Sequence, residues 1–491
     1  MNDPTVYSLI PVGLLAIYFA IFQTEKLFLS LAFLTPLSVN IEEYTSSFGL
    51  FLPTEPLLFG LMILLSAFQL KKGFLPVQVW RSPLIWTIII YLLWLLLSAI
   101  TSSHPLVSLK FILARLWFII PILFFGTYFF QKRSNRIAFL WLFIVATVLV
   151  IIYTLIHHSF YGFGEKEGHW VMSPFFKDHT IYGAIVALVL PLVVGLYLYK
   201  KHNPLMQMTL LTLIVIILVG LVLSYTRAAW LSVVGSIGVA VVLYYKVSWK
   251  PIAVLASIGV VVVLIQWDRI QMELERNKYE HTTEAFDERL QSAANISTDA
   301  SNLERINRWS CAIEMFKQRP IMGYGPGTYA FEYAPFQRPE NLTIISTNFG
   351  DMGNAHSEYL GALAETGLIG MLSLIALIFA IFYTGITLYH RLPKANKEDR
   401  IIVLSTIMAL TTYFIHAFLN NYMDTDKAAV PIWGICAMWL VYERELSTND
   451  QSKATDWVSP GLRQLPDALQ SDTQTPRCRW AKCQLLVWWK P

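Results

Sequence analysis

Residues 83–100 read Pro-Leu-Ile-Trp-Thr-Ile-Ile-Ile-Tyr-Leu-Leu-Trp-Leu-Leu-Leu-Ser-Ala-Ile and carry no charged side chain. An α-helix needs about 20 apolar residues to cross the roughly 30 Å of hydrocarbon in a bilayer. Because this stretch has nearly that length and is apolar throughout, it predicts a transmembrane helix. A membrane protein is therefore the first expectation for the whole chain.

Apolar runs of the same kind recur along the 491 residues. They predict membrane spans at 7–22, 27–40, 55–70, 83–100, 107–130, 137–157, 180–199, 206–224, 228–245, 251–267, 368–389, 401–420 and 428–443. The first two are short enough to form one broken or re-entrant element, so about 12 or 13 helices are expected. Charged residues make up only 14% of the chain, against roughly 25% in a soluble domain. The expected fold is an all-α polytopic membrane protein with one large, mostly helical loop between late helices.

Charge, the first run and the cysteines argue against several other classes. The net charge of +4 is too small to indicate a nucleic-acid partner. No basic residue precedes the run 7–22 and no small-residue cleavage pattern follows it, so a retained span is expected rather than a signal peptide. The cysteines, at positions 311, 436, 478 and 483, give no disulfide framework.

Lysine and arginine are concentrated in every second connection between the predicted spans. The basic connections contain Lys71, Lys72 and Arg81; Lys132, Arg133 and Arg136; Lys200 and Lys201; Lys246 and Lys250; and Arg391, Lys394, Lys397 and Arg400. Short loops rich in these residues stay on the cytoplasmic side. By alternation, segments 41–54, 101–106, 158–179, 268–367 and 421–427 are expected to face outward, and the chain after Arg444 to lie inside.

The spans and loops divide the chain into four predicted parts. These are N-terminal transmembrane helices at 1–267, an outer loop at 268–367, C-terminal transmembrane helices at 368–446 and a polar tail at 447–491. The tail is expected to be disordered. Its Cys478 and Cys483 have no partner pair for a zinc site, so a membrane-surface patch is the preferred interpretation.

The outer loop 268–367 is predicted to fold onto the membrane domain as a lid. Residues 270–294 fit either a charged amphipathic helix or a solvated segment. After them, a second helix carries an apolar stripe that should pack on the membrane domain. The stripe consists of Leu303, Ile306, Trp309, Ile313 and Phe316, and Pro320 ends the helix.

The second half of the outer loop is predicted to turn and re-enter the membrane. Glycines 323, 325 and 327 with Pro326 favour a chain reversal. Residues 356–366 predict a short helix with Gly367 as its C-cap, which leads directly into the span 368–389. This arrangement would place His356 at the outer membrane surface.

Four arginines are candidates for binding an anionic substrate. Arg305 and Arg308 are three apart and should project from one side of their helix. Arg115 lies within a span near its outer end, and Arg227 lies at an outer connection. An ionisable residue in a span is a functional candidate, although Arg115 and Arg227 could also snorkel to lipid headgroups. Guanidinium groups suit a lipid pyrophosphate carrying a glycan, without a metal, and would stabilise the leaving-group charge.

Histidine supplies the candidate acid–base group. The histidines placed outside are His157, His158, His169, His179, His281 and His356. His356 stands apart because a helix fixes it above a span close to Glu358, and its imidazole could take a proton from an acceptor hydroxyl. His179 opens another span and could line the same cavity. The predicted substrate-binding residues are therefore His179, Arg308, Arg115, Glu358 and Tyr329.

The residues after the span 401–420 suggest one competing interpretation. Asp424 and Asp426 are spaced so that they could bind a divalent ion bridging a pyrophosphate. Lys427 is adjacent and the loop is short, so no metal or other cofactor is expected. For His416 and Asn420 a hydrogen-bonding role in the core is the preferred interpretation.

Several motifs resemble one known family. His356-Ser357, nine residues and Gly367-Leu-Ile-Gly370 resemble the His-[Asn/Ser/Gln]-x9-Gly-x-x-Gly signature of the bacterial O-antigen ligase and polymerase superfamily. The run Arg305-x3-Trp309-x2-Ala312-x2-Met315-x4-Pro320-x2-Gly323-x-Gly325-Pro-Gly327 resembles the same family, as does Thr226-Arg227-Ala-Ala-Trp230-Leu231. The resemblance covers roughly residues 170–445.

The resemblance implies a GT-C-type, metal-independent glycosyltransferase at the periplasmic face of the bacterial inner membrane. Its donor would be an undecaprenyl-pyrophosphate-linked glycan and its acceptor lipid A-core. The catalytic set it implies is Arg227 and Arg305 on the donor pyrophosphate and His356 beside the acceptor. Alternatives are a polymerase that extends a second repeat unit, a protein O-oligosaccharyltransferase and, from another class, a transporter of polyprenyl-linked sugars. No internal repeat of the kind typical of transporters is visible.

Overall fold

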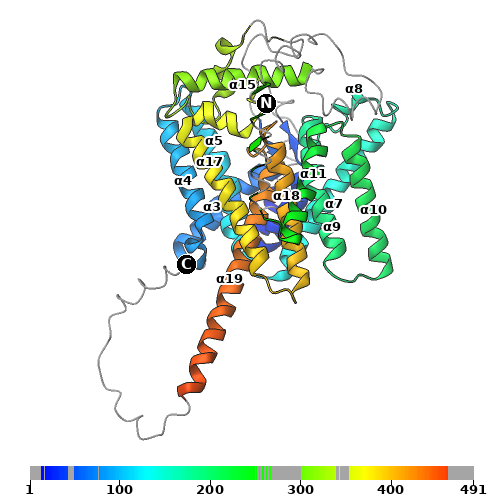
Figure 1. Cartoon of the computed structure of the whole chain (residues 1–491), viewed down its shortest axis with the longest axis vertical. Helices are drawn as coiled ribbons and strands as arrows, with labels where there is room; N and C mark the ends of the chain where they lie inside the picture. Colours follow the sequence, from blue (N-terminus) through cyan, green and yellow to red (C-terminus); the bar gives the residue numbers. More distant parts are fainter. Residues whose placement is uncertain are drawn as a thin grey trace, which may run out of the picture. The chain divides into compact units, whose positions relative to one another are not determined.

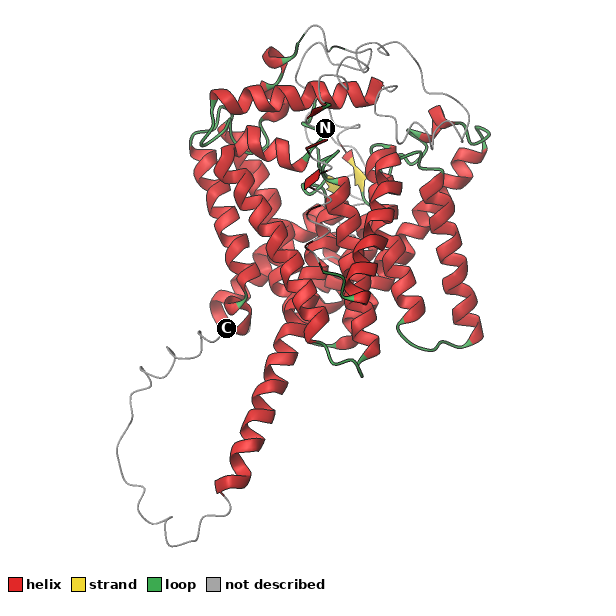
Figure 2. Cartoon of the chain, in the orientation of Figure 1, coloured by secondary structure: helices red, strands yellow, loops and turns green. Residues whose placement is uncertain are grey.

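The computed structural model describes residues 13–15, 17–41, 49–73, 77–248, 300–338 and 353–462, with a few single positions besides. Helices make up almost all of this part of the chain (Figures 1 and 2). The amphipathic segment predicted at 270–294, most of the span 251–267 and the start of the span 7–22 lie outside the described residues.

The elements follow one another with short connections. The helices are α2 (Thr24–Leu37), α3 (Thr54–Lys72), α4 (Pro83–Ile100), α5 (Pro105–Phe118), α6 (Gly126–Phe129), α7 (Arg133–Ser159), α8 (Glu165–Gly168), α9 (His179–Leu198), α10 (Pro204–Val222), α11 (Arg227–Tyr245), α15 (Ala300–Gln318), α16 (Tyr329–Glu332), α17 (Glu358–Arg391), α18 (Lys397–His416) and α19 (Asp426–Leu462). A π-helical stretch, η3 (Ile119–Phe125), joins α5 to α6, and 3-10 turns lie at η2 (Val77–Arg81) and η5 (Ala334–Phe336). Strands β1 (Val39–Asn40) and β2 (Phe51–Leu52) form an antiparallel pair.

Eight of the described helices are long and apolar enough to cross a membrane. They are α3, α4, the continuous run from α5 to α6, α7, α9, α10, α11 and α17. The prediction of an all-α polytopic membrane protein is therefore confirmed. The predicted spans 27–40, 401–420 and 428–443 are also helical, but α2 is short, and α18 and α19 begin with charged residues.

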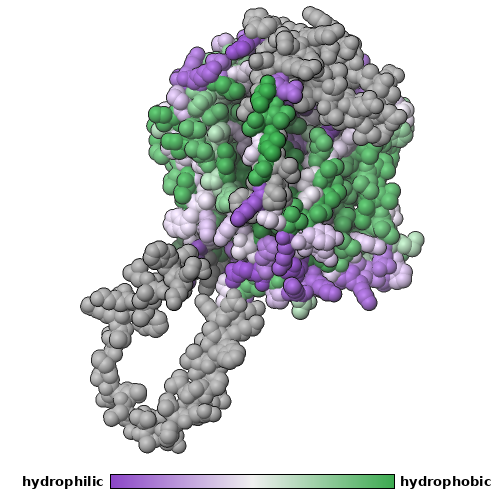
Figure 3. Space-filling view, viewed as in Figure 1, coloured by the Kyte–Doolittle hydropathy of each residue, from purple (hydrophilic) through white to green (hydrophobic). Residues whose placement is uncertain are grey.

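The middle of the bundle is formed by helices that contact protein on nearly every side. Helix α9 packs against α18, α10 and α11, and the stretch of α19 from Ala428 to Tyr442 is buried throughout. Helix α10, by contrast, exposes apolar side chains such as Met208 and Val215. Figure 3 shows the resulting hydrophobic belt, with a hydrophilic band at one end.

The two ends of the bundle gather different loops. At one end, Lys132 bonds to Glu25 at 2.6 Å and Arg133 to Glu398 at 2.8 Å. At the other end, Ser103 N–H donates to the Tyr324 carbonyl at 2.8 Å. The Tyr225 hydroxyl likewise donates to the Phe163 carbonyl at 2.7 Å. The segments predicted to share a side therefore do meet, and which side is periplasmic remains a prediction.

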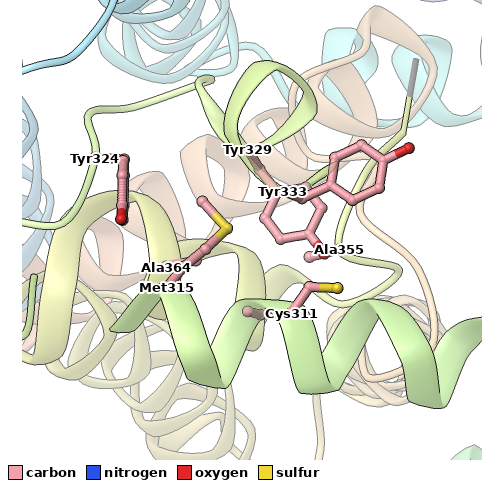
Figure 4. Close-up of a cluster of buried hydrophobic side chains, with 8 residues drawn as sticks. Cys311, Met315, Tyr324, Tyr329, Tyr333, Ala355 and Ala364 are labelled. Carbon is pink, nitrogen blue, oxygen red and sulfur yellow. The ribbon is translucent and has the colours of Figure 1, made fainter. Parts of the chain in front are cut away.

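Helix α15 lies across the end of the bundle away from the basic loops and packs on α17 (Figure 1). Its buried face differs from the predicted stripe, because Ile313 is 41% exposed. Ile306 of the stripe is buried as predicted, and the other buried apolar residues of the helix are Cys311, Ala312 and Met315, which join Tyr324, Tyr329, Tyr333, Ala355 and Ala364 in one cluster (Figure 4). Small residues let the tyrosine rings approach the helix, and a search for large apolar residues overlooks them. Leu303 lies where side chains are not described.

The glycine turn after α15 docks on the connection between α4 and α5. Gly325 has φ +115°, and a Cβ there would lie 2.1 Å from the Ser102 hydroxyl. The Ser98 hydroxyl donates to the Met322 carbonyl at 2.6 Å and the Ser108 hydroxyl to the Pro326 carbonyl at 2.9 Å. Because the turn is so close to the bundle, glycine is required there.

Helix α17 is interrupted at Gly367, which has φ 69° and ψ −171°. Here the short helix and the span meet, as the sequence predicts. The Leu368 N–H donates to the Pro320 carbonyl at 2.9 Å, which joins the kink to the end of the α15 segment.

Helix α19 continues to Leu462, past the predicted start of the polar tail at residue 447. The contacts divide the chain into two compact units, 1–443 and 444–491.

Candidate functional site

A cavity of about 720 Å³ lies beneath α15 at the end of the bundle away from the basic loops. It is lined by residues of α4, α5, α15 and α17, the glycine turn, and the segments that precede α9 and α19. Of the residues predicted to form a site, Arg115, Arg308, Tyr329, His356 and Glu358 line it. The fold thus brings together residues that are up to 243 positions apart, from 115 to 358.

His356 stands at the cavity wall just before α17, in a left-handed conformation with φ 46°. Its N–H donates to Asn354 Oδ1 at 3.0 Å, and its carbonyl accepts from Trp309 Nε1 at 3.3 Å. A left-handed histidine is uncommon and is held only where its surroundings fix it. The ring atom Nδ1 is buried and has no hydrogen-bond partner among the described residues.

The charge state of His356 follows from its surroundings. Burial, together with the nearby Arg305 and Arg308, lowers its pKa to about 4, and a hydrogen bond with Asn420 acts in the opposite direction. The imidazole is therefore neutral at neutral pH, so it can accept a hydrogen bond or a proton but carries no charge of its own.

Arg308 lies between α15 and the cavity and is 3% exposed. Its Nε donates to Glu304 Oε1 at 2.7 Å, one turn earlier on α15, and its guanidinium lies 3.9 Å from the centre of the Tyr333 ring. A Cβ on Gly353 would lie 1.8 Å from Nη1 of Arg308, so glycine at 353 makes room for the guanidinium. Arg305 is half-buried and close enough to lower the pKa of His356, although it does not line the cavity in the described part of the chain.

Arg115 does not snorkel toward lipid headgroups, which was one of its two predicted roles. It is 5% exposed, and its Nη1 donates to the Met423 carbonyl at 2.5 Å. The guanidinium lies 4.9 Å from the centre of the Phe111 ring. Its Nε is buried with no hydrogen-bond partner in the described ranges. The side chain points into the protein because the last turns of α5 pack against the segment before α19.

Glu358 and Tyr329 have their polar atoms engaged by the protein. Glu358 Oε1 accepts from the Tyr422 and Met423 amides at 2.8 and 2.7 Å and from the Tyr413 hydroxyl at 2.9 Å. The Tyr329 hydroxyl donates to the Arg308 carbonyl at 2.7 Å. Both residues are predicted to bind substrate, and these contacts also hold the segments around the cavity in place.

Arg227 and His179 lie beside each other, outside the described lining of the cavity. Arg227 begins α11, and the hydroxyl of the preceding Thr226 donates to the His179 carbonyl at 2.8 Å. The His179 ring stacks on His169 with 4.1 Å between centres. The next residue, Thr180, contacts the Tyr422 hydroxyl, and Asp178 lines the cavity. His356 thus lines the cavity, whereas Arg227 is not part of its described lining.

Of the two aspartates in the alternative metal site, Asp424 and Asp426, the second is engaged elsewhere in the protein. Asp426 is buried and accepts from the Ser38 hydroxyl at 2.5 Å. The Lys427 ammonium group donates to the carbonyls of Thr35 and Ser38, each at 2.7 Å. Asp426 and Lys427 therefore hold the end of α2, while Asp424 lines the cavity alone of this pair. No group of three potential metal ligands occurs within the described residues.

Sequence reasoning also passed over charged residues that line the cavity. These are Glu55, Lys110, Lys177, Asp178, Glu304 and Glu365. Asp178 had a recognisable signal, because it is the N-cap of α9 and accepts from the Thr180 and Ile181 amides. His416 and Asn420 behave as predicted and bond to each other at 2.9 Å in the core.

Comparison with known proteins finds a likeness to one family. Residues 212–375 match the family model described as O-antigen ligase, a range that includes Arg227, Arg305, His356 and Gly367. This part of the chain is thus similar to the O-antigen ligase superfamily. Members are membrane enzymes of the ligase or polymerase type, acting on glycans.

One relative of this O-antigen ligase-like chain is an uncharacterised protein of Haemophilus influenzae. The two are 22% identical over 254 residues, which make up 50% of this chain and 60% of the relative. The match thus spans less than two thirds of the relative's length, and that protein has no assigned activity to compare.

Proposed function

We propose that the protein transfers a glycan from undecaprenyl pyrophosphate to a sugar of lipid A-core, by direct displacement with inversion at the anomeric carbon. The observation that carries the proposal is the cavity in which a neutral His356 lies beside Arg305 and Arg308, with Arg115 on another wall. This combination suits a reaction that joins an uncharged hydroxyl to the carbon next to a pyrophosphate.

The donor site follows from the arginines. A pyrophosphate that leaves the anomeric carbon gains negative charge, and guanidinium groups held in place stabilise that charge. Arg308 and Arg115 line the cavity, and Arg305 lies next to His356. Family resemblance assigns the pyrophosphate to Arg227 and Arg305. Arg227 begins α11, outside the described lining, and in this proposal it would meet the lipid-linked donor as the donor approaches beside α11.

The acceptor site follows from His356. A neutral imidazole can accept a hydrogen bond from an acceptor hydroxyl and so orient it, or take its proton. Its left-handed backbone, fixed by Asn354 and Trp309, keeps the ring in one place. Orientation of the hydroxyl against the anomeric carbon is itself a large part of such catalysis.

The side of the membrane follows from the basic loops. Lysines and arginines concentrate at the end opposite the cavity, and such loops stay in the cytoplasm. We place the cavity at the periplasmic face of the inner membrane, where lipid-linked glycans and lipid A-core would both be within reach.

Alanine variants of Arg227, Arg305 and His356 test the proposal. Each should lower glycan transfer by about 100-fold or more, with membrane insertion and melting temperature close to those of the parent protein. Arg338→Ala is the matched control, because this loop arginine pairs with Glu314 at 3.4 Å on the surface and does not line the cavity in the described part of the chain. Normal transfer by all three variants would contradict the site.

The acceptor is tested by reconstitution of the purified protein with a lipid-linked glycan. Lipid A-core, donor alone and a peptide are offered in turn, and product size is measured. Product on lipid A-core supports the proposal. Longer glycan from donor alone identifies a polymerase, which the family also includes, and glycopeptide identifies a protein transferase. Movement of lipid-linked sugar across proteoliposomes without a new glycosidic bond identifies a transporter.

A further inference from the structure

Asp424 is a carboxylate aimed into the cavity. It lines the cavity and is exposed to it, whereas Tyr422, Met423 and Asp426 around it are buried. Other residues of this segment also line the cavity, but Asp424 is the exposed carboxylate among them.

The backbone on the N-terminal side of Asp424 is held by two elements. Glu358 on α17 accepts from the amides of Tyr422 and Met423, at 2.8 and 2.7 Å. Arg115 on α5 donates to the carbonyl of Met423 at 2.5 Å. A side chain that only filled space would not need its backbone fixed from two sides.

Asp424 also differs from the other carboxylates that line the cavity. These are Glu55, Asp178, Glu304, Glu358 and Glu365. Each accepts a hydrogen bond from a neighbouring group: Phe51 N–H to Glu55, Thr180 N–H to Asp178, Arg308 to Glu304, Met423 N–H to Glu358 and Tyr329 N–H to Glu365. Within the described residues, Asp424 bonds only to its own amide and lies near the charges of Arg115 and Lys177. The other carboxylates are thus each tied to a neighbouring residue, whereas the oxygens of Asp424 face the cavity.

We propose that Asp424 is the general base of the transfer, an inference that rests on the proposed function. The acceptor O–H bond breaks and its proton passes to a carboxylate oxygen of Asp424. The acceptor oxygen forms the new bond to the anomeric carbon, and the bond from that carbon to the phosphate oxygen breaks. Undecaprenyl pyrophosphate leaves with the electron pair, and Asp424 later releases the proton to water.

His356 then orients the acceptor hydroxyl without taking its proton. Asp424 faces the cavity, but the surrounding protein separates it from bulk water, and this desolvation raises its pKa above the ordinary range, against the effect of Arg115. Burial has the opposite effect on His356, whose pKa is lowered to about 4. Both shifts act in the direction that the geometry requires, because desolvation favours a proton on a carboxylate and disfavours one on an imidazole.

The experiment compares Asp424→Asn, Asp424→Ala and the control Glu332→Gln in the full-length reconstituted protein. Asp424→Asn should lower kcat by about 100-fold or more, with KM for the lipid-linked donor changed less than about threefold. Sodium formate, a small carboxylate, should raise the rate of Asp424→Ala by about tenfold or more, and should not restore His356→Ala. Glu332 lies outside the cavity and pairs with His104 at 3.1 Å, so its variant should keep the parent rate.

Several outcomes would overturn the inference. If Asp424→Asn keeps more than half of the parent kcat, Asp424 is not the general base. The same conclusion follows if Asp424→Ala is inactive and formate does not restore its activity. If Asp424→Ala does not fold, as judged by size exclusion, the kcat of the isosteric Asp424→Asn decides. Activity lost with a chelator and restored by Mg²⁺ would make Asp424 a metal ligand instead. Absence of any transfer by the parent protein would contradict the proposed function itself, which is a different result from an active Asp424→Asn.

Discussion

The arginines at the two ends of the bundle are used in different ways. At the end with the basic loops, Arg133 bonds to Glu398 and Asp399 at 2.8 and 2.9 Å. Arg136 donates to the Phe130 carbonyl at 2.6 Å. Arg400 donates to the carbonyls of Tyr389 and Leu392, at 3.0 and 3.1 Å. At the cavity end, Arg115 makes a single carbonyl bond and keeps its Nε without a partner among the described residues.

The position of an arginine in the sequence predicts the side of the membrane on which it lies. Its contacts show whether it stabilises the fold or can still bind a ligand. Carboxylates and the carbonyls at helix C-termini satisfy the arginines of the basic end, which stabilises the helix ends. At the cavity end, Arg115 Nε and His356 Nδ1 are buried with no hydrogen-bond partner among the described residues, and Asp424 faces the cavity. Buried polar groups are normally satisfied, so unused ones in a cavity are the mark of a ligand site.

The largest effect is expected when one arginine is replaced at each end of the bundle and the two variants are compared. Arg115→Met should lower transfer by about 100-fold or more, because the cavity loses a donor and the charge opposite Glu358. Arg400→Met should keep near-parent transfer and lose only about 1 kcal/mol of stability at the end of α17. Both are measured by transfer rate and thermal unfolding in the same detergent. Equal loss of transfer in the two variants would remove the distinction between the ends.

Much of this comparison could be predicted from the sequence, and part could not. The basic loops, His356 before a helix and the break at Gly367 follow from local patterns of charge, histidine and glycine. The burial of Arg115 depends on which face of α5 meets the segment before α19, and no local pattern states that. The exposure of Ile313 has a similar cause, since Cys311 and Ala312 become the packing face only when the tyrosines arrive from the next segment.

The surroundings of Asp424 are the clearest example of what the sequence does not predict. Its spacing from Asp426 suggested a shared metal, yet the two side chains go to different places. Asp426 accepts a hydrogen bond from Ser38, which is 388 residues away in the chain. The amide of Met423, just before Asp424, donates a hydrogen bond to Glu358 of α17. Contacts between residues so distant in sequence cannot be read from a spacing of two.

A second difference is that the cavity end of the bundle is built partly by the glycine turn that packs on the connection between α4 and α5. Adding one methyl group to this turn tests its importance. Gly325→Ala places a Cβ 2.1 Å from the Ser102 hydroxyl at φ +115°, which alanine adopts only with strain. Transfer should fall about tenfold and the melting temperature by a few degrees, since strain of this kind costs about 1–3 kcal/mol. Gly60→Ala in α3 is the control, because a Cβ at Gly60 meets nothing within 4 Å. A Gly325→Ala variant as stable and active as Gly60→Ala would show that the turn is not held against the bundle.

The smallest predicted effect concerns added positive charge at the cavity end. His356 has a pKa of about 4 in the folded protein, where burial, Arg305 and Arg308 disfavour its charged form, against about 6.5 when unfolded. Between these values the unfolded state binds more protons, so the stability that neutral His356 contributes is full above about pH 6.5 and is lost as pH falls toward 4. From pH 7.5 to 5.5 the loss should be about 1 kcal/mol. His356→Asn cannot be protonated and tolerates a positive φ, so its melting temperature should fall less over that range than the parent's. Identical pH dependence in the two proteins would show that His356 is not held neutral by the arginines and would weaken the contrast with the basic end, where further positive charge meets carboxylates.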